Sequence, residues 1–125
     1  LAADTTVMAG GEILAKPESF SDAQRIWQHL KEPDHCVLTG IALWHDGVVL
    51  QRVVSTKVDF AGIPEVEQRI YWDSGEPQDK AGAYAIQGRA ALYIRGIEGS
   101  YSNVVGLPLA ETAALLRQAD YPLWL

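Results

Sequence analysis

The chain has 125 residues, of which 48% are hydrophobic and 21% are charged. This is enough for one domain with a buried core, and the composition excludes a disordered or fibrous chain. Sixteen Asp and Glu residues against ten Lys and Arg give a formal net charge of -6, which argues against a general binder of nucleic-acid backbones. An anionic substrate would therefore need a local basic pocket.

Two features bear on where the protein works. Cys36 is the single cysteine, which rules out an internal disulfide and fits a reducing, cytoplasmic compartment. No apolar run approaches the roughly 20 residues of a membrane helix, so we expect no membrane among the partners, and the acidic net charge argues against a nucleic acid. The chain begins with Leu1 inside an apolar, strand-like run, and we expect an N-terminal segment to precede it.

Two hairpins are predicted in the first half of the chain. Residues 2–9 predict a strand that turns at the glycine pair 10–11 into a short return over 12–14. A longer hairpin is predicted within 36–60, because two β-rich runs flank the Asp-Gly pair at 46–47. Strands joined by such short turns are antiparallel.

Three helices are predicted around these hairpins. The first carries a capping box of Ser21 and Gln24, and Pro33 ends it. Pro64 and Pro108 each open a further helix at its first position. The side chains expected to face inward from these two helices are Val66, Ile70, Tyr71, Leu109, Ala113, Leu115 and Leu116.

The remaining segments are short connections. The stretch DSGEPQDKAG is typical of a loop, AALYIRGIEG of a strand and turn, and YSNVVG of a short extended piece. Hairpins with flanking helices indicate an α/β or α+β layered domain.

The common catalytic signatures are missing from the sequence. It contains no phosphate-binding P-loop, no dinucleotide-binding glycine fingerprint and no nucleophile elbow. Its three histidines show no metal-ligand spacing, and with one cysteine a zinc site is not expected.

Three polar clusters remain as candidates. Asp4, with Thr5 beside it, offers oxygens to Mg²⁺ or to water, but it also suits a capping or edge-strand role. Lys16 can meet a phosphate as a point charge or simply be solvated. Gln87, at the end of DKAGAYAIQG (79–88), has a donor and an acceptor that can read a nucleobase edge, although it can equally satisfy its own loop.

Four stretches, in order, resemble the Maf family of nucleoside triphosphate pyrophosphatases. They are ADTTVMAGGEILAKP (3–17), HCVLTGIAL (35–43), SGEPQDKAGAYAIQG (74–88) and IEGSYSNVVGLPLAE (97–111). The resemblance implies conversion of a nucleoside triphosphate to a monophosphate and pyrophosphate, with a divalent metal that is usually Mg²⁺. It also implies one α/β domain over residues 1–125, with flanking helices, a curved mixed sheet like that of inosine triphosphate pyrophosphatases, and two lobes around a cleft.

The resemblance assigns roles to individual residues. It implies that Asp4 is the active-site carboxylate, described as a proton acceptor, and that Lys16 contacts the triphosphate. An ordinary aspartate is a weak base at neutral pH, so we read Asp4 first as a metal ligand or a water-orienting group. Thr5 and Gln87 fall at two positions whose residues differ between subfamilies. The residues found here resemble those of the branch that prefers dTTP and UTP. Lys80 either helps to bind the phosphates or forms an ion pair with Asp79, and we favour the ion pair.

The chain departs from the family at its start. Members begin with a strand and an S-x-S-P-R-R loop that binds phosphates, followed by an acidic residue and a lysine that serve the site. We expect this segment to be missing and residues 1–125 alone to be nearly inactive, because one lysine does not replace the two-point binding of phosphate by arginine. We also expect its loss to leave the edge of the first strand unpaired.

Three functions therefore remain open. The leading hypothesis is a house-cleaning pyrophosphatase that removes unwanted or modified pyrimidine nucleotides. The second is a nucleotide-binding regulator linked to cell division and septum formation, with little or no turnover. The third is a structural α/β domain whose motifs have lost their use. A nucleoside triphosphate is the expected partner under the first hypothesis, and a homodimer is left open.

Overall fold

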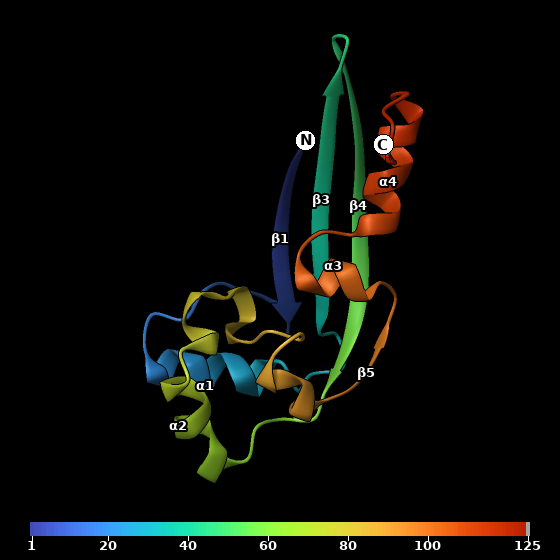
Figure 1. The fold of residues 1–125 in the computed structure, drawn as a ribbon. Coiled ribbons are helices and arrows are strands. Elements are labelled where there is room, and N and C mark those ends of the chain that lie inside the picture. Colours follow the sequence, from blue (N-terminus) through green and yellow to red (C-terminus); the bar gives the residue numbers. More distant parts are fainter. Residues whose placement is uncertain (125) are drawn as a thin grey trace.

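A five-stranded sheet forms the spine of the chain, as shown by a computed structural model that describes residues 1–124 (Figure 1). The strands lie in the order β2-β1-β3-β4-β5. They are β1 (Ala2–Ala9), β2 (Glu12–Leu14), β3 (Cys36–His45), β4 (Val48–Phe60) and β5 (Ile94–Glu98). The α/β class is confirmed, but every strand pairing within residues 1–124 is antiparallel, so the parallel pairs of a mixed sheet are not seen there.

Both predicted hairpin turns are present, and they explain the antiparallel pairing. Gly10 and Gly11 have φ of 60° and 71°, and Asp46 and Gly47 have φ of 49° and 77°. Two consecutive positive φ angles give the turn whose twist matches that of the flanking strands. The first turn is also held by Asp34, whose carboxylate accepts from the Gly10 and Gly11 amides at 2.7 and 3.0 Å.

Helices cover the two ends of the sheet. They are α1 (Phe20–His29), α2 (Glu65–Asp73), α3 (Tyr101–Val105) and α4 (Leu109–Gln118), with short 3-10 turns η1 (Glu76–Asp79), η2 (Ala81–Ala83) and η3 (Arg89–Tyr93). Figure 1 shows α1, α2 and the 3-10 turns at one end and α4 beside the long β3–β4 hairpin at the other. No helix within residues 1–124 is long and apolar enough to cross a membrane.

The buried side chains form two separate clusters. The larger one packs α1 and the 3-10 turns against the sheet, and the indole of Trp27 within it donates to the carbonyl of Ala83 at 2.8 Å. The smaller one joins α4 to β3 and β4 through Ile41, Leu43, Leu115 and Ala119. The arrangement of two lobes around a cleft stays a prediction.

Two helix boundaries differ from the predicted ones. Helix α1 is capped by Ser19, whose hydroxyl accepts from the Asp22 amide at 3.1 Å, and not by the predicted pair Ser21 and Gln24. It ends at His29, before Pro33, and the chain then turns so that Asp34 reaches the first hairpin. Both serines precede a polar residue at the right spacing, so the sequence pattern alone cannot choose between them.

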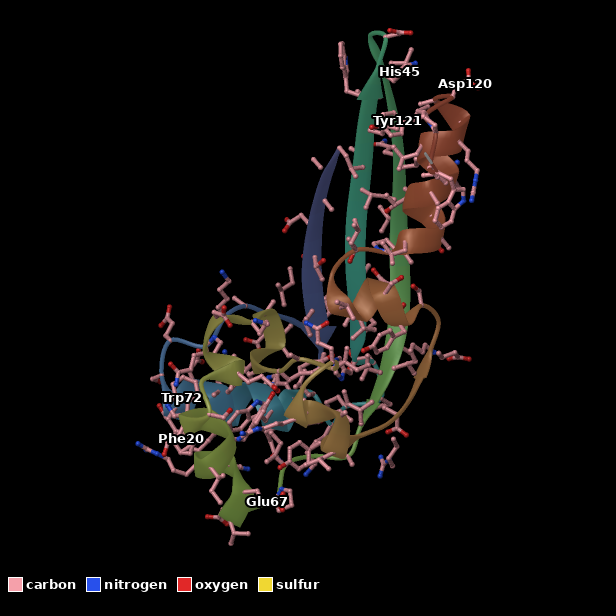
Figure 2. The ribbon with its side chains drawn as sticks, viewed as in Figure 1. Phe20, His45, Glu67, Trp72, Asp120 and Tyr121 are labelled. Carbon is pink, nitrogen blue, oxygen red and sulfur yellow. The ribbon has the colours of Figure 1, made fainter. Side chains whose placement is uncertain are left out.

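The packing of the later helices was predicted only in part. Tyr71 is buried at 3% exposure, but Val66 and Ile70 are 83% and 66% exposed. In α4 Leu115 is buried as expected, whereas Leu109 is 60% exposed. Figure 2 shows why α2 is turned this way, because Phe20 and Trp72 meet where it packs on α1. Packing of these aromatic rings sets the inward face of α2.

The segment YSNVVG is helical, and its prediction as an extended piece was wrong. It forms α3, whose N-cap Ser100 accepts from the Asn103 amide at 3.1 Å. Asn103 is fully buried and donates through Nδ2 to the carbonyls of Val37 and Val54 at 3.0 and 3.2 Å. These bonds fasten α3 across β3 and β4 and thereby build one wall of the pocket described next.

Candidate active site

A pocket of about 190 Å³ lies where β1, the segment after η1 and the end of α3 meet. It is lined by Thr5, Val7, Val37, Asp79, Lys80, Ala81, Tyr84, Ala85, Ile86, Gln87, Val104, Val105 and Gly106. Small-molecule sites usually measure about 300–1,000 Å³, so this pocket suits one part of a larger ligand. Three of the predicted substrate-binding residues, Thr5, Lys80 and Gln87, are brought together here.

Thr5 is held in place by two hydrogen bonds. Its hydroxyl oxygen lies 2.9 Å from the hydroxyl oxygen of Thr39 on β3 and donates to the carbonyl of Gly106 at 3.2 Å. Since Thr5 donates to Gly106, the Thr39 hydroxyl must donate to Thr5. The Thr5 side chain is therefore fixed at the pocket wall with its methyl and hydroxyl groups in a defined orientation.

Both lysines predicted from the sequence, Lys16 and Lys80, influence the carboxyl group of Asp79 at the rim of the pocket. Lys80 Nζ lies 3.0 Å from Asp79 Oδ1, which is the pair favoured from the sequence. This hydrogen bond lowers the pKa of the Asp79 carboxyl below its usual value, and the charge of Lys16 also contributes. Lys16 itself is exposed after β2 and has no ion pair within residues 1–124. Two lysines thus lie near a single carboxylate at this rim of an otherwise acidic chain.

Gln87 comes at the end of a tight turn. The Gly88 amide donates to the carbonyl of Ala85 at 3.0 Å, which closes the turn and leaves the Gln87 side chain exposed at the pocket. No hydrogen bond of the Gln87 side chain is found among the described residues. Its amide is therefore free to exchange a donor and an acceptor with a ligand.

Asp4 does not share this pocket with the other candidates. In the register of β1 with β3, Asp4 is opposite Gly40 and Thr5 is opposite Thr39. Successive side chains of a strand point to opposite faces, so Asp4 projects from the face that Thr5 does not. It is exposed there beside a shallow groove that runs over β1, β3 and β4.

The donor set at Asp4 fits only one kind of metal site. No group of three or more His, Cys, Asp or Glu side chains in the described part of the chain could hold a metal ion. Mg²⁺, however, commonly binds through one or two carboxylates together with substrate phosphates and water. An exposed Asp4 fits a divalent ion that arrives with a triphosphate, and it does not fit a permanently held metal.

Several residues of the site were not found from the sequence. Tyr84 is 5% exposed and forms part of the pocket, and its hydroxyl lies 3.1 Å from His35 Nε2. The wall from α3 was missed because a helix of five residues has no apolar repeat to detect. Its signal was the capping serine, Ser100, three residues before Asn103.

Comparison with known proteins identifies the family. The family model described as Maf-like protein matches residues 1–119. The chain belongs to the Maf family. Three relatives that carry the name dTTP/UTP pyrophosphatase come from Anaeromyxobacter dehalogenans strain 2CP-C, Hahella chejuensis and Myxococcus xanthus.

These relatives match nearly the whole chain but are longer than it. The first is 52% identical over 127 residues, covering 98% of this chain and 66% of the relative. The second is 48% identical over 124 residues, covering 99% and 62%. The third is 50% identical over 125 residues, covering 98% and 62%. The Maf chain thus spans less than two thirds of the length of these relatives.

Proposed function

We propose that the intact protein hydrolyses dTTP, UTP and related or modified pyrimidine nucleotides to the monophosphate and pyrophosphate. The observation that carries this proposal is the pocket that brings Thr5, Lys80 and Gln87 together from distant parts of the sequence. The names of the similar relatives support the same substrate class. The divalent ion is proposed to be Mg²⁺, because oxygen ligands and phosphates are its usual partners.

The pocket is built to take the base. Val7, Val37 and Ile86 give it apolar walls against which a flat ring can pack. Thr5 and Gln87 supply the polar groups that distinguish one base edge from another. Selection through such groups is strong, because a wrong base leaves a buried donor or acceptor unpaired.

The phosphates then lie at the rim, near Lys16 and Lys80. Water attacks the α-phosphorus, the bond from that phosphorus to the bridging oxygen breaks, and pyrophosphate leaves with the bonding electrons. The proton of the water passes to solvent or to a nearby carboxylate. A bound divalent ion would offset the charge that develops on the phosphate oxygens. This chain supplies positioning and charge for the step.

Asp4 can take part only if the ligand reaches the other face of the sheet. Within residues 1–124, β2 pairs with Val7–Ala9 alone, so Ala2–Thr6 has one unpaired side, as expected. In the intact protein the preceding segment is expected to pair along this side, so we propose only that the triphosphate extends from the pocket, where Thr5 lies, towards Asp4. There Asp4 binds the divalent ion that accompanies the phosphates or orients the attacking water.

The test is pyrophosphate release by the protein at its complete natural length. With Mg²⁺ present, UTP and dTTP should be cleaved faster than GTP, and Gln87→Ala should reduce this preference. Losing a base-edge hydrogen bond costs about 1–3 kcal/mol, equivalent to roughly 5- to 150-fold in selectivity. Gln118→Ala on α4, where the side chain is exposed and distant from the pocket lining, is the matched control.

The outcome separates the competing functions. Pyrophosphate release with an unchanged preference in Gln87→Ala would contradict the role of Gln87 as a base reader. Tight binding of UTP without release would favour the nucleotide-binding regulator instead. If the protein neither bound UTP nor released pyrophosphate, the hypothesis of a structural domain would remain.

A further inference from the structure

The side chain of Glu76 makes contacts that neither the resemblance nor the pocket lining assigns. Glu76 begins η1, and its Oε1 accepts from the backbone amide of Arg89 at 2.9 Å. Its Oε2 accepts from the amide of Ala90 at 3.3 Å and from the hydroxyl of Tyr71. One carboxylate therefore holds the first two amides of η3, which directly follow Gln87 and Gly88.

Gly88 has no side chain, and this leaves room for the Glu76 carboxylate. A Cβ atom placed on Gly88 would lie 2.6 Å from Cδ of Glu76 and would overlap its Oε1. The φ of Gly88 is −113°, which any residue adopts, but its ψ of −147° lies outside the regions that residues with a Cβ atom favour. The close approach of the Glu76 side chain and these backbone angles both favour glycine at this position.

The other end of this contact is anchored in the core. Tyr71 is 3% exposed, and its ring packs 5.7 Å from that of Trp27 and 6.1 Å from that of Tyr93. Burial, together with the bond to Glu76, raises the pKa of its hydroxyl, which therefore stays a donor. A chain of contacts therefore connects the core, through Tyr71 and Glu76, to the backbone beside Gln87.

From these contacts we propose that Glu76 is a positioning residue, which holds the turn 85–88 so that Gln87 meets the base in a fixed orientation. This inference rests on the proposed function, since it assigns base selection to the same pocket. Glu76 does not touch the substrate, and its effect on selectivity is transmitted through the backbone. A displacement of about 1 Å at a positioned group can cost on the order of a hundredfold in rate.

Two measurements on the full-length protein test the inference. Glu76→Ala should speed hydrogen exchange of the Arg89 and Ala90 amides at least tenfold, because both lose their acceptor. The same variant should reduce the ratio of kcat/KM for UTP over that for GTP about tenfold. Glu76→Gln, which keeps one acceptor oxygen, should fall between Glu76→Ala and the unaltered protein in both measurements. Glu65→Gln, an exposed position on α2, is the control and should change neither.

The two readouts distinguish the possible failures. Fast amide exchange with an unchanged UTP to GTP ratio would overturn the proposal, because the turn would be released without any effect on base selection. Slow exchange in Glu76→Ala would also overturn it, because the carboxylate would not be what holds the turn. If the unaltered protein cleaved no nucleotide, the proposed function would fail, while the exchange experiment would still report on the contact. Thermal unfolding of each variant excludes a general loss of structure.

Discussion

Replacing Gly88 by alanine should displace the Glu76 carboxylate and destabilise the protein by about 2 kcal/mol. The added methyl group has no room beside Glu76, so the carboxylate must rotate towards solvent. The Arg89 amide is exposed and can bond to water, but the Tyr71 hydroxyl is buried and is left without its acceptor. The amide of the fully buried Ala90 also loses a bond, which at 3.3 Å is a long one. Leaving one buried polar group unsatisfied costs about 1–3 kcal/mol, which sets the magnitude.

A double-mutant cycle isolates this contact. Glu76→Ala alone should cost about as much as Gly88→Ala, because it leaves the same hydroxyl unpaired. In the double variant no carboxylate is left to displace, so adding Gly88→Ala should cost only the strain of placing a Cβ atom at the Gly88 backbone angles. The coupling energy should therefore be about 2 kcal/mol.

Urea unfolding followed by tryptophan fluorescence measures all four proteins of the cycle. The chain has four tryptophans, and Trp27 lies in the core beside Tyr71. If the cost of the double variant equalled the sum of the two single costs to within about 0.5 kcal/mol, the reasoning would be refuted, because mutations at independent sites add in that way. A Gly88→Ala variant as stable as the unaltered protein would refute it as well.

Three further predictions concern the fold and the chemistry. Asn103→Ala should cost about 2–4 kcal/mol in urea unfolding, because the carbonyls of Val37 and Val54 lose the bonds from the Asn103 amide inside the protein, whereas Thr56 Oγ1 keeps the Ser100 amide as a donor. Asp4→Asn should lower turnover by about two decades without changing base preference, which steady-state kinetics with UTP and GTP would show. Burial lowers the pKa of His35 from 6.5 to about 4, so stability should be full above pH 6.5 and decline as the pH falls towards 4, by about 3 kcal/mol in all. Urea unfolding across this pH range should lose that slope in a His35→Phe variant.

The strands could be predicted from the sequence because their signals are local. The glycine pair at 10–11 and the Asp-Gly pair at 46–47 define two turns, and the β-rich runs beside them become β1 to β4. The faces of α2 could not be predicted in this way. Val66 and Ile70 are as apolar as Tyr71, yet aromatic packing among distant residues decides that only Tyr71 is buried.

The contact of Glu76 shows what local patterns leave out. In the sequence, Glu76 is one of several charged residues in a loop-like stretch, and Gly88 resembles any turn glycine. Only the folded chain places the two against each other and shows that the glycine accommodates a side chain. The relation spans twelve residues and depends on Tyr71 as a third partner. No periodic pattern encodes such a relation.

The placement of Asp4 and Thr5 gives the last constraint on the site. These neighbours in the sequence lie on opposite faces of β1, so the residue expected to act on the phosphates and the one expected to select the base cannot share one pocket. A base in the Thr5 pocket and a phosphate near Asp4 must therefore belong to one ligand that reaches both faces of the sheet. A nucleotide, with a flat base and a flexible triphosphate, has the shape to reach both positions. A change at Asp4 should then alter turnover and a change at Thr5 should alter base preference, with little coupling between them.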